Sequence, residues 1–302
     1  MNTMAANKFK INVISNTKQI TQLLTQISFV DQKHQEQPFL YLDLEGKDLS
    51  REGTISILTL LLHPSPSPDP QVVYLVDIHR LGAVAFDTPG SSANTLRNIL
   101  EDERISKVFF DVRNDADALF KHYGVKLQGV EDVQLMESAS RKSTYSRRLL
   151  NGLARCIEDL FDSNELKEWK RVKNVVKELF TQHEGVAGNI FEQRPLPNDV
   201  AAYCAGDVQY LPQLWRRYIL YASENNDHVR LETAKRVEES MKPGYQPHGS
   251  HKALAPWSTK QNKALDALHN VKRSMRIFDE LDDDELGNAG EEFDTYFNDM
   301  VE

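Results

Sequence analysis

The sequence contains little cysteine and no long apolar segment. Its 302 residues include two cysteines, Cys156 and Cys204, whose spacing fits neither a zinc site nor a disulfide framework. No apolar run approaches the roughly 18 residues that a membrane-spanning helix needs. No apolar core of a signal peptide follows the first lysines. We therefore expect no membrane partner, no secretory signal and a reducing compartment, which is cytoplasmic or nuclear.

Basic residues are absent from the C-terminal segment 277–302. This segment holds eleven of the 45 acidic residues, so removing it from the net charge of −9 leaves about +2 for residues 1–276. The body of the chain is therefore compatible with a polyanionic partner, which the charge of the whole chain argues against. Self-repulsion predicts that the acidic tail is disordered. We interpret it as a solubilising tail, with a pseudo-substrate that competes for a cationic groove as the second hypothesis.

The order of the apolar patterns predicts an α/β fold. The chain opens with a strand and a helix whose predicted cap is Thr17. Strand patterns follow at 39–46, 54–63, 72–79 and 107–110. The short separations between the first three of these predict an antiparallel meander. Helical periodicity prevails from Arg147 onward, so we expect a mixed β-sheet flanked by helices, with a helical C-terminal extension.

Two acidic residues interrupt the apolar strand at 39–46. Side chains alternate along a strand, so Asp43 and Glu45 share one face, opposite the leucines. If buried without partners, the two carboxylates repel each other and each loses several kcal/mol of solvation. A divalent cation between them would remove both penalties. The alternative is an exposed strand end with two solvated acids.

Further acids occur at two later places in the chain. Asp111 and Asp115 follow the strand at 107–110 and stand four residues apart, and one of the acids here can be a helix cap. Tyr203 and Asp207 are also four residues apart, which stacks them on one face of a predicted helix. A core tyrosine beside an acid is the alternative for this last pair. Each pattern is weak alone.

Together these patterns resemble the motifs of the DEDDy 3′–5′ exonucleases, the ribonuclease D-like group with a ribonuclease H-like fold. LDLEG resembles the first motif, KVFFDVRNDADAL the second and RPLPNDVAAYCAGDVQYLPQLW the third, and LLNGLARCIEDLF resembles the helix between the last two. Family members often carry His where this chain has Phe110, which is not one of the four acids. The resemblance implies an exonuclease domain at 8–222, a helical extension and linker at 223–276, and the acidic tail at 277–302.

The resemblance also implies a two-metal-ion site. Its expected ligands are Asp43, Glu45, Asp115 and Asp207, with Asp111 open as an alternative to Asp115. Hard carboxylate oxygens suit Mg²⁺ or Mn²⁺, and two such ions can clamp the attacking and leaving oxygens of a phosphoryl displacement. Tyr203 is expected to orient the attacking water, because an ordinary pKa near 10 makes it a poor base.

The implied reaction is hydrolysis of the 3′-terminal phosphodiester of single-stranded RNA or DNA, with release of nucleoside 5′-monophosphates. The alternative is a catalytically silent relative that binds RNA, or serves as an adaptor, through the same fold. Complete retention of the four acids and the tyrosine favours activity.

Two basic stretches, 141–148 and 167–177, are candidates for nucleic-acid binding. A groove that carries a single strand needs cations for the backbone and rings for the bases. The candidate cations are Arg147, Arg148, Lys170 and Lys173, and the candidate rings are Tyr145, Trp169 and Phe191. A solvated basic helix face is the alternative, and for 167–177 it is at least as strong.

Overall fold

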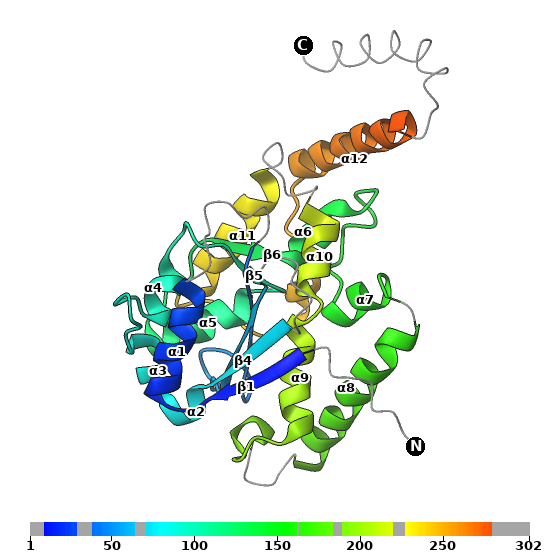
Figure 1. Ribbon diagram of the computed structural model, residues 1–302. Helices are drawn as coiled ribbons and strands as arrows, with labels where there is room; N and C mark the ends of the chain where they lie inside the picture. The colour runs from blue at the N-terminus through cyan, green and yellow to red at the C-terminus, as the bar shows by residue number, and fades with distance from the viewer. Residues whose placement is uncertain are drawn as a thin grey trace.

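The computed structural model describes residues 9–28, 38–63, 71–161, 163–183, 189–219 and 227–279. The acidic tail predicted from residue 277 falls almost entirely outside these residues. Within them, a six-stranded sheet lies between two layers of helices (Figure 1). Across the sheet the strands are β1 (Phe9–Ile14), β4 (Gln71–Asp77), β3 (Ile57–Leu62), β2 (Leu40–Glu45), β5 (Lys107–Phe109) and β6 (Val130–Asp132).

The sheet is mixed, as the sequence predicted. Strand β3 runs antiparallel to both of its neighbours, β2 and β4, which confirms the predicted meander. The pairs β1–β4, β2–β5 and β5–β6 are parallel. Parallel pairing aligns the carboxyl ends of β2 and β5 at one edge, so the acids that end β2 and those that follow β5 lie close to each other.

Helices cover both faces of this sheet. One layer contains α1 (Thr17–Ser28), α2 (Ile78–Leu81), α3 (Val84–Asp87), α4 (Leu96–Glu101) and α5 (Arg113–Tyr123). The other contains α6 (Val133–Ser140), α7 (Leu153–Glu158), α8 (Ser163–His183), the 3₁₀ turn η2 (Ile190–Glu192), α9 (Asn198–Val208) and α10 (Leu211–Tyr218). Figure 1 shows α1, α3 and α4 on the side of the sheet opposite to α7, α8 and α9.

Strand β2 divides its side chains between these two layers. Leu40, Leu42 and Leu44 belong to the core beneath α1, α4 and α5. Tyr41 belongs to the opposite core, beneath α9 and α10. The period of two therefore turns the acids of β2 toward α9.

Helix α1 begins one residue earlier than the predicted cap implies. Asn16, and not Thr17, accepts the backbone N–H of Gln19 with its side chain, at 3.0 Å. The Gln19 side chain in turn accepts the backbone N–H of Ser15 at 2.8 Å. The prediction for Thr17 was wrong because Asn16 is as good a cap and starts a reciprocal pair of hydrogen bonds. The predicted apolar face of this helix is buried, including Ile20 and Leu24.

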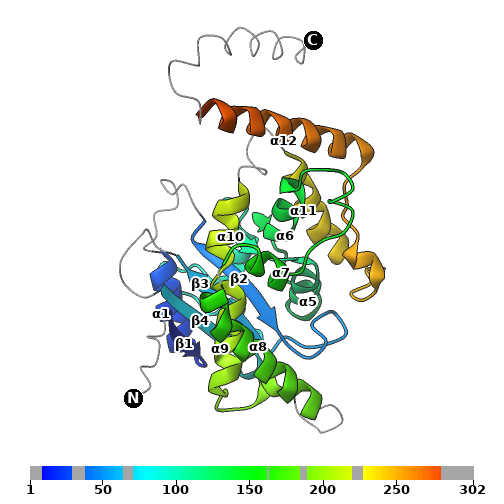
Figure 2. The same cartoon turned by 90° about the vertical axis from the view of Figure 1, so that its right-hand side faces the viewer.

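Residues beyond position 222 pack into the same body. Helix α11 (Asp227–Ser240) lies against α5, α6 and β6, and its Arg236 donates to Asp132 Oδ2 at 2.7 Å. A connection with the 3₁₀ turn η4 (Ser250–Ala253) then leads to α12 (Thr259–Asp279), which lies across α6 and α11 (Figure 2). The division at residue 222 stays a prediction, but α11 shares the buried core. None of the described helices has both the length and the apolar character to cross a membrane.

Candidate functional site

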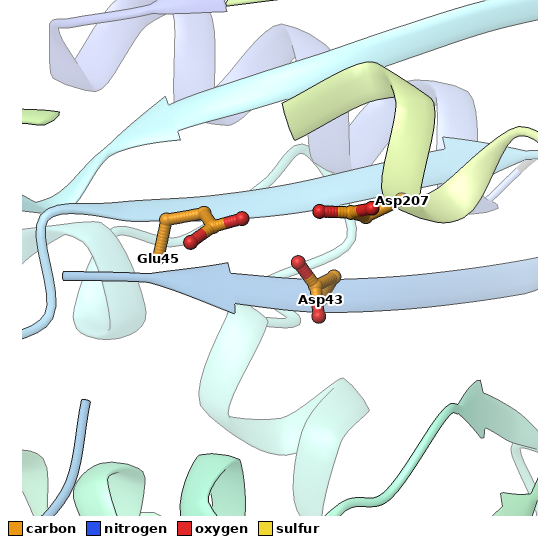
Figure 3. A group of neighbouring side chains, drawn as sticks. All are labelled: Asp43, Glu45 and Asp207. Carbon is orange, nitrogen blue, oxygen red and sulfur yellow. The ribbon is translucent and has the colours of Figure 1, made fainter. Parts of the chain in front are cut away.

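Three carboxylates from two distant parts of the chain meet at one edge of the sheet. Asp43 and Glu45 project from the end of β2, and Asp207 projects from α9 (Figure 3). Ligand oxygens of these three side chains lie within 4.8 Å of one another. The sequence predicted all three as metal ligands, and the structure brings them together.

Burial and mutual repulsion raise the pKa values of the carboxyl groups in this cluster. Burial is the largest cause that raises the pKa of Asp43 well above its ordinary range, and the charges of Asp207 and Asp115 raise it further. Burial also raises the pKa of Glu45, to which Asp43 and Asp207 add. The cluster therefore favours a bound cation over three bare carboxylates.

Asp115 lies beside this cluster, in the first turn of α5. Its Oδ1 accepts the backbone N–H of Leu44 at 3.2 Å, between the two acids of β2. Burial, as the largest cause, raises the pKa of Asp115 to about 7. Its carboxylate is thus held next to the other three, although it is not among the oxygens within 4.8 Å.

Asp111, the open alternative to Asp115, is engaged elsewhere. Arg113 donates to both of its carboxylate oxygens, at 2.5 and 2.6 Å. Asp111 adopts a left-handed backbone, φ 61°, and its N–H donates to Asp132 at 3.0 Å. These contacts hold the Asp111 carboxylate in an ion pair, which favours Asp115 as the acid of the second motif.

Tyr203 lies one turn before Asp207 on α9, as predicted. Burial, followed by the charges of Glu45 and Asp207, raises the pKa of its phenol far above the ordinary value. The phenol therefore stays protonated at neutral pH. Close packing holds the helix here, because Trp169 Nε1 donates to the Gly206 carbonyl at 3.2 Å and leaves little room for a larger residue at 206.

Lys173 lies at the carboxylates, with 24% of its side chain exposed, and its role as a nucleic-acid contact stays a prediction. Its ammonium donates to Asp207 Oδ1 and lies 3.7 Å from the centre of the Tyr203 ring. The register of α8 places Lys173 opposite Asp207 of α9. A cation at this position partly neutralises the cluster.

The donor set of the cluster fits Mg²⁺ or Mn²⁺. Asp43, Glu45 and Asp207 offer only carboxylate oxygens, which hard divalent cations prefer. Cys204 is buried one turn from Asp207, and burial raises the pKa of its thiol well above the ordinary value. This thiol stays protonated, so it is a poor ligand for a softer metal.

A pocket of about 390 Å³ opens beside the cluster, between α7, α8 and α9. Its lining includes Asp207, Lys173, Lys170 and Asn174, with Leu153 and Ala154 on the α7 side. The volume is in the range of small-ligand sites. Asp207 joins this pocket to the carboxylate cluster, and the ammonium groups of Lys170 and Lys173 suit a phosphate group.

Arg147 does not face solvent, so its prediction as a nucleic-acid contact was wrong. Its guanidinium is fully buried and donates to the Arg141 carbonyl, to Asn262 and to Asp266. The sequence could not reveal this role, because Asn262 and Asp266 are more than 100 residues away on α12. Arg148, its neighbour, is exposed.

The buried guanidinium of Arg147 gives a testable stability difference. Arg147→Met is expected to lower the free energy of unfolding by about 2–4 kcal/mol, because four hydrogen bonds to α12 and the 141–147 loop are lost. Arg148→Met is the matched control and should change it by about 0.5 kcal/mol or less. Urea titration of both variants measures the difference. Equal stabilities would contradict the structural role of Arg147.

Two of the three predicted stacking rings are also core residues. Trp169 and Phe191 are buried, so neither can receive a base without rearrangement. Lys170 is half-exposed and pairs with Glu158 at 2.8 Å. Tyr145 is the predicted ring that is exposed. Two side chains that the sequence did not point to, Tyr245 and Lys252, also approach the site through Asn114.

Comparison with known families tests the resemblance that the sequence motifs suggested. The family model described as 3′–5′ exonuclease matches residues 18–217, which is more than half of the chain. The chain belongs to the 3′–5′ exonuclease family. It has the DEDDy pattern of that family, with the acids in the order Asp43, Glu45, Asp115 and Asp207 and with Tyr203 before the last.

Solved structures share the RNase D fold with this exonuclease domain. RNase D of Trypanosoma brucei in complex with RNA U12 superposes with a TM-score of 0.61 and 22% identity, over 86% of this chain and 80% of that chain. Escherichia coli RNase D, an exoribonuclease involved in structured RNA processing, gives 0.51 and 14%, over 77% and 51%. At these identities the likeness establishes the fold, which is the predicted ribonuclease H-like arrangement.

Curated relatives are similar over part of their length. The piRNA biogenesis protein EXD1 of Mus musculus is 30% identical over 178 residues, which is 58% of this chain and 28% of the mouse protein. The human protein of the same name is 35% identical over 102 residues, or 34% of this chain and 17% of the human protein. The chain therefore matches less than a third of the length of these relatives.

Proposed function

We propose that this protein is a metal-dependent 3′–5′ exonuclease that removes nucleoside 5′-monophosphates from single-stranded nucleic acid. The observation that carries the proposal is the group of three carboxylates within 4.8 Å, Asp43, Glu45 and Asp207. Asp115 lies beside it and raises the pKa of Asp43 further. Such a concentration of acids is costly unless a cation is bound, and it is the arrangement that divalent-metal phosphodiesterases use.

The four carboxylates would hold the metal ions by their position. The charges of Asp207 and Asp115 both act on Asp43, so Asp43 would be the ligand that the two ions share. Glu45 and Asp207 would help to hold one ion, and Asp115 would help to hold the other. When bound, two Mg²⁺ or Mn²⁺ ions supply the charge that activates water and stabilises the leaving oxygen.

Tyr203 and Lys173 position the reactants in this proposal. The Tyr203 phenol stays protonated, so it orients the attacking water by donating or accepting a hydrogen bond and does not act as the base. Lys173 holds its ammonium against the Tyr203 ring and fixes the ring next to Asp207. The pocket beside Asp207 accommodates the 3′-terminal nucleotide.

RNA is the first substrate to test, because the curated relatives are named for piRNA biogenesis. Single-stranded RNA and DNA, each labelled at the 5′ end, would be incubated with Mg²⁺, Mn²⁺ or EDTA. We expect a ladder of products shortened from the 3′ end with either metal and none with EDTA. Chromatography of the released material should show nucleoside 5′-monophosphates.

The rival interpretation is a catalytically silent protein that binds RNA through the same fold. Binding of the labelled strand without shortening, in both metals, would establish that interpretation and overturn the enzymatic one. Release of internal fragments would instead identify an endonuclease, because an exonuclease shortens the strand by single nucleotides.

A further inference from the structure

Exposed apolar side chains gather at one place on the surface. Tyr145, Leu149 and Leu254 are 79%, 57% and 58% exposed. Leu149 and Leu254 pair in an antiparallel bridge, and the Arg148 N–H donates to the Tyr145 carbonyl at 3.3 Å. Large exposed apolar side chains are ordinary when single, but three together mark a binding surface.

The surroundings of these side chains are basic. The Arg148 guanidinium lies 5.9 Å from the centre of the Tyr145 ring, and His251 is exposed one turn before Leu254. The contributing segments 141–149 and 246–255 contain no Asp or Glu. We call the set Tyr145, Arg148, Leu149, His251 and Leu254 the Tyr145 surface.

Arg148 differs from the basic residues of α8. Lys170 pairs with Glu158, Arg171 with Glu168, and Lys173 with Asp207. Across the part of the chain that the structure describes, Arg148 has no carboxylate within ion-pair distance. Among the described residues, its charge is thus left without a carboxylate partner.

One segment of the Tyr145 surface also contacts the residues around Asp115. The segment 250–254 carries His251 and Leu254 at the surface and Lys252 between them. The Lys252 ammonium donates to Asn114, which directly precedes Asp115, and Arg113 donates to the Lys252 carbonyl at 2.9 Å. One short segment thus joins the surface to the edge of the catalytic cluster.

Hydrogen bonds hold the Tyr145 surface in place. Arg147 ties its loop to α12, and Arg141 donates to the Ser146 and Leu149 carbonyls at 2.7 and 2.6 Å. The Ala255 N–H donates to the Arg148 carbonyl at 3.1 Å. A surface ordered before binding loses little conformational entropy when a ligand arrives.

We propose that the Tyr145 surface binds the single strand upstream of its 3′-terminal nucleotide, with one base stacked on Tyr145 and a phosphate paired with Arg148. This inference rests on the proposed function, because that function puts the 3′ end at the carboxylates. A ring beside an unpaired cation is the combination that single strands require, and the apolar Leu149 and Leu254 pack against base edges. The site is assembled partly from segment 250–254, which lies outside the residues that match the family.

The test compares a long substrate with a short one. The variant Tyr145→Ala/Arg148→Gln and the wild type would be titrated in EDTA with a labelled uridylate dodecamer and with a uridylate dinucleotide. We expect the affinity for the dodecamer to fall by about 10-fold or more, through lost stacking and one lost phosphate contact. The slope of log K against log salt should become shallower by about 0.7. The loss for the dinucleotide should be far smaller.

The matched control is Leu231→Ala/Arg104→Gln. It removes an exposed leucine and an exposed arginine, 61% and 84% exposed, which lie on α11 and before β5. This control should leave the affinity for the dodecamer unchanged. An equal loss for both oligonucleotides would place Tyr145 and Arg148 at the terminal nucleotide and overturn the proposal.

Unchanged affinity for the dodecamer would also overturn the proposal. Binding in EDTA needs no turnover, so this result stands apart from the proposed function. If the wild type binds the dodecamer through the Tyr145 surface but never shortens it, the proposed exonuclease activity is wrong and the proposed binding surface stands. If the double variant shortens the dodecamer as the wild type does, the proposal for the Tyr145 surface is wrong and the proposed exonuclease activity stands.

Discussion

Replacing Asp43 by Asn is expected to lower metal-dependent hydrolysis by at least about 10³-fold, which is about 4 kcal/mol of transition-state stabilisation. Asp43 is the first acid of the cluster, and the charges of Asp207 and Asp115 both raise its pKa. The amide keeps the size of the side chain but removes the charge that two metal ions would share. No other carboxylate can replace it, because β2 turns only one other acid, Glu45, to this face.

The fold of the Asp43→Asn variant should be at least as stable as that of the wild type. The substitution removes one of several like charges that burial brings together. Single-turnover kinetics with saturating metal would measure the chemical step, and urea titration would measure the stability. Titration with Mn²⁺, monitored by the electron paramagnetic resonance signal of the ion, would show weaker metal binding independently of activity.

The matched control is Asp48→Asn. Asp48 is exposed three residues after β2 and adopts φ 46°, a left-handed conformation that Asn tolerates well. This variant should retain full activity. Substantial metal-dependent activity in Asp43→Asn, with normal activity in Asp48→Asn, would disprove the proposed site.

The carboxylate site was predictable because its signals are local. The alternation of β2 directs Asp43 and Glu45 to one face, and a spacing of four puts Tyr203 and Asp207 on one side of α9. The chain order of the motifs then identified the family. The position of Asp115 depends on a long-range contact. The parallel pairing of β2 and β5 brings its carboxylate to the backbone of Leu44.

The nucleic-acid contacts were not predictable in the same way. Arg147 and Arg148 are adjacent and chemically identical, yet one is buried under α12 and the other exposed. Lys173 has the sequence pattern of a solvated helix face, but in the structure its ammonium donates to Asp207. Whether a basic side chain meets water or a distant acid depends on packing partners that no local pattern encodes.

Removing the metal is expected to make stability depend steeply on pH. In EDTA, the free energy of unfolding should fall as the pH rises from about 4 to about 8, by an amount on the order of 4 kcal/mol for Asp115 alone. The cause is burial, which raises the pKa of Asp115 from 3.8 to about 7 in the folded protein. The pKa values of Asp43 and Glu45 are raised in the same direction.

The sign of this effect follows from proton binding. A carboxyl group with a raised pKa holds its proton more tightly in the folded than in the unfolded protein. Its contribution to stability is therefore complete below the unfolded pKa near 4 and is lost as the pH rises through the folded pKa near 7. Above this range the folded protein must hold several carboxylates close together, with Lys173 as a partial counter-charge.

Bound metal should reverse this loss, because a divalent cation replaces the protons. Urea titrations in EDTA and in excess Mg²⁺ or Mn²⁺, at a series of pH values, would show two curves that diverge as the pH rises. The divergence should shrink in Asp115→Asn, which removes the group with the pKa near 7. Parallel curves in the wild type would mean that the folded protein gains nothing from cations at this site. The carboxylates would then be neutralised from within the chain, and the metal-dependent mechanism would lose its physical basis.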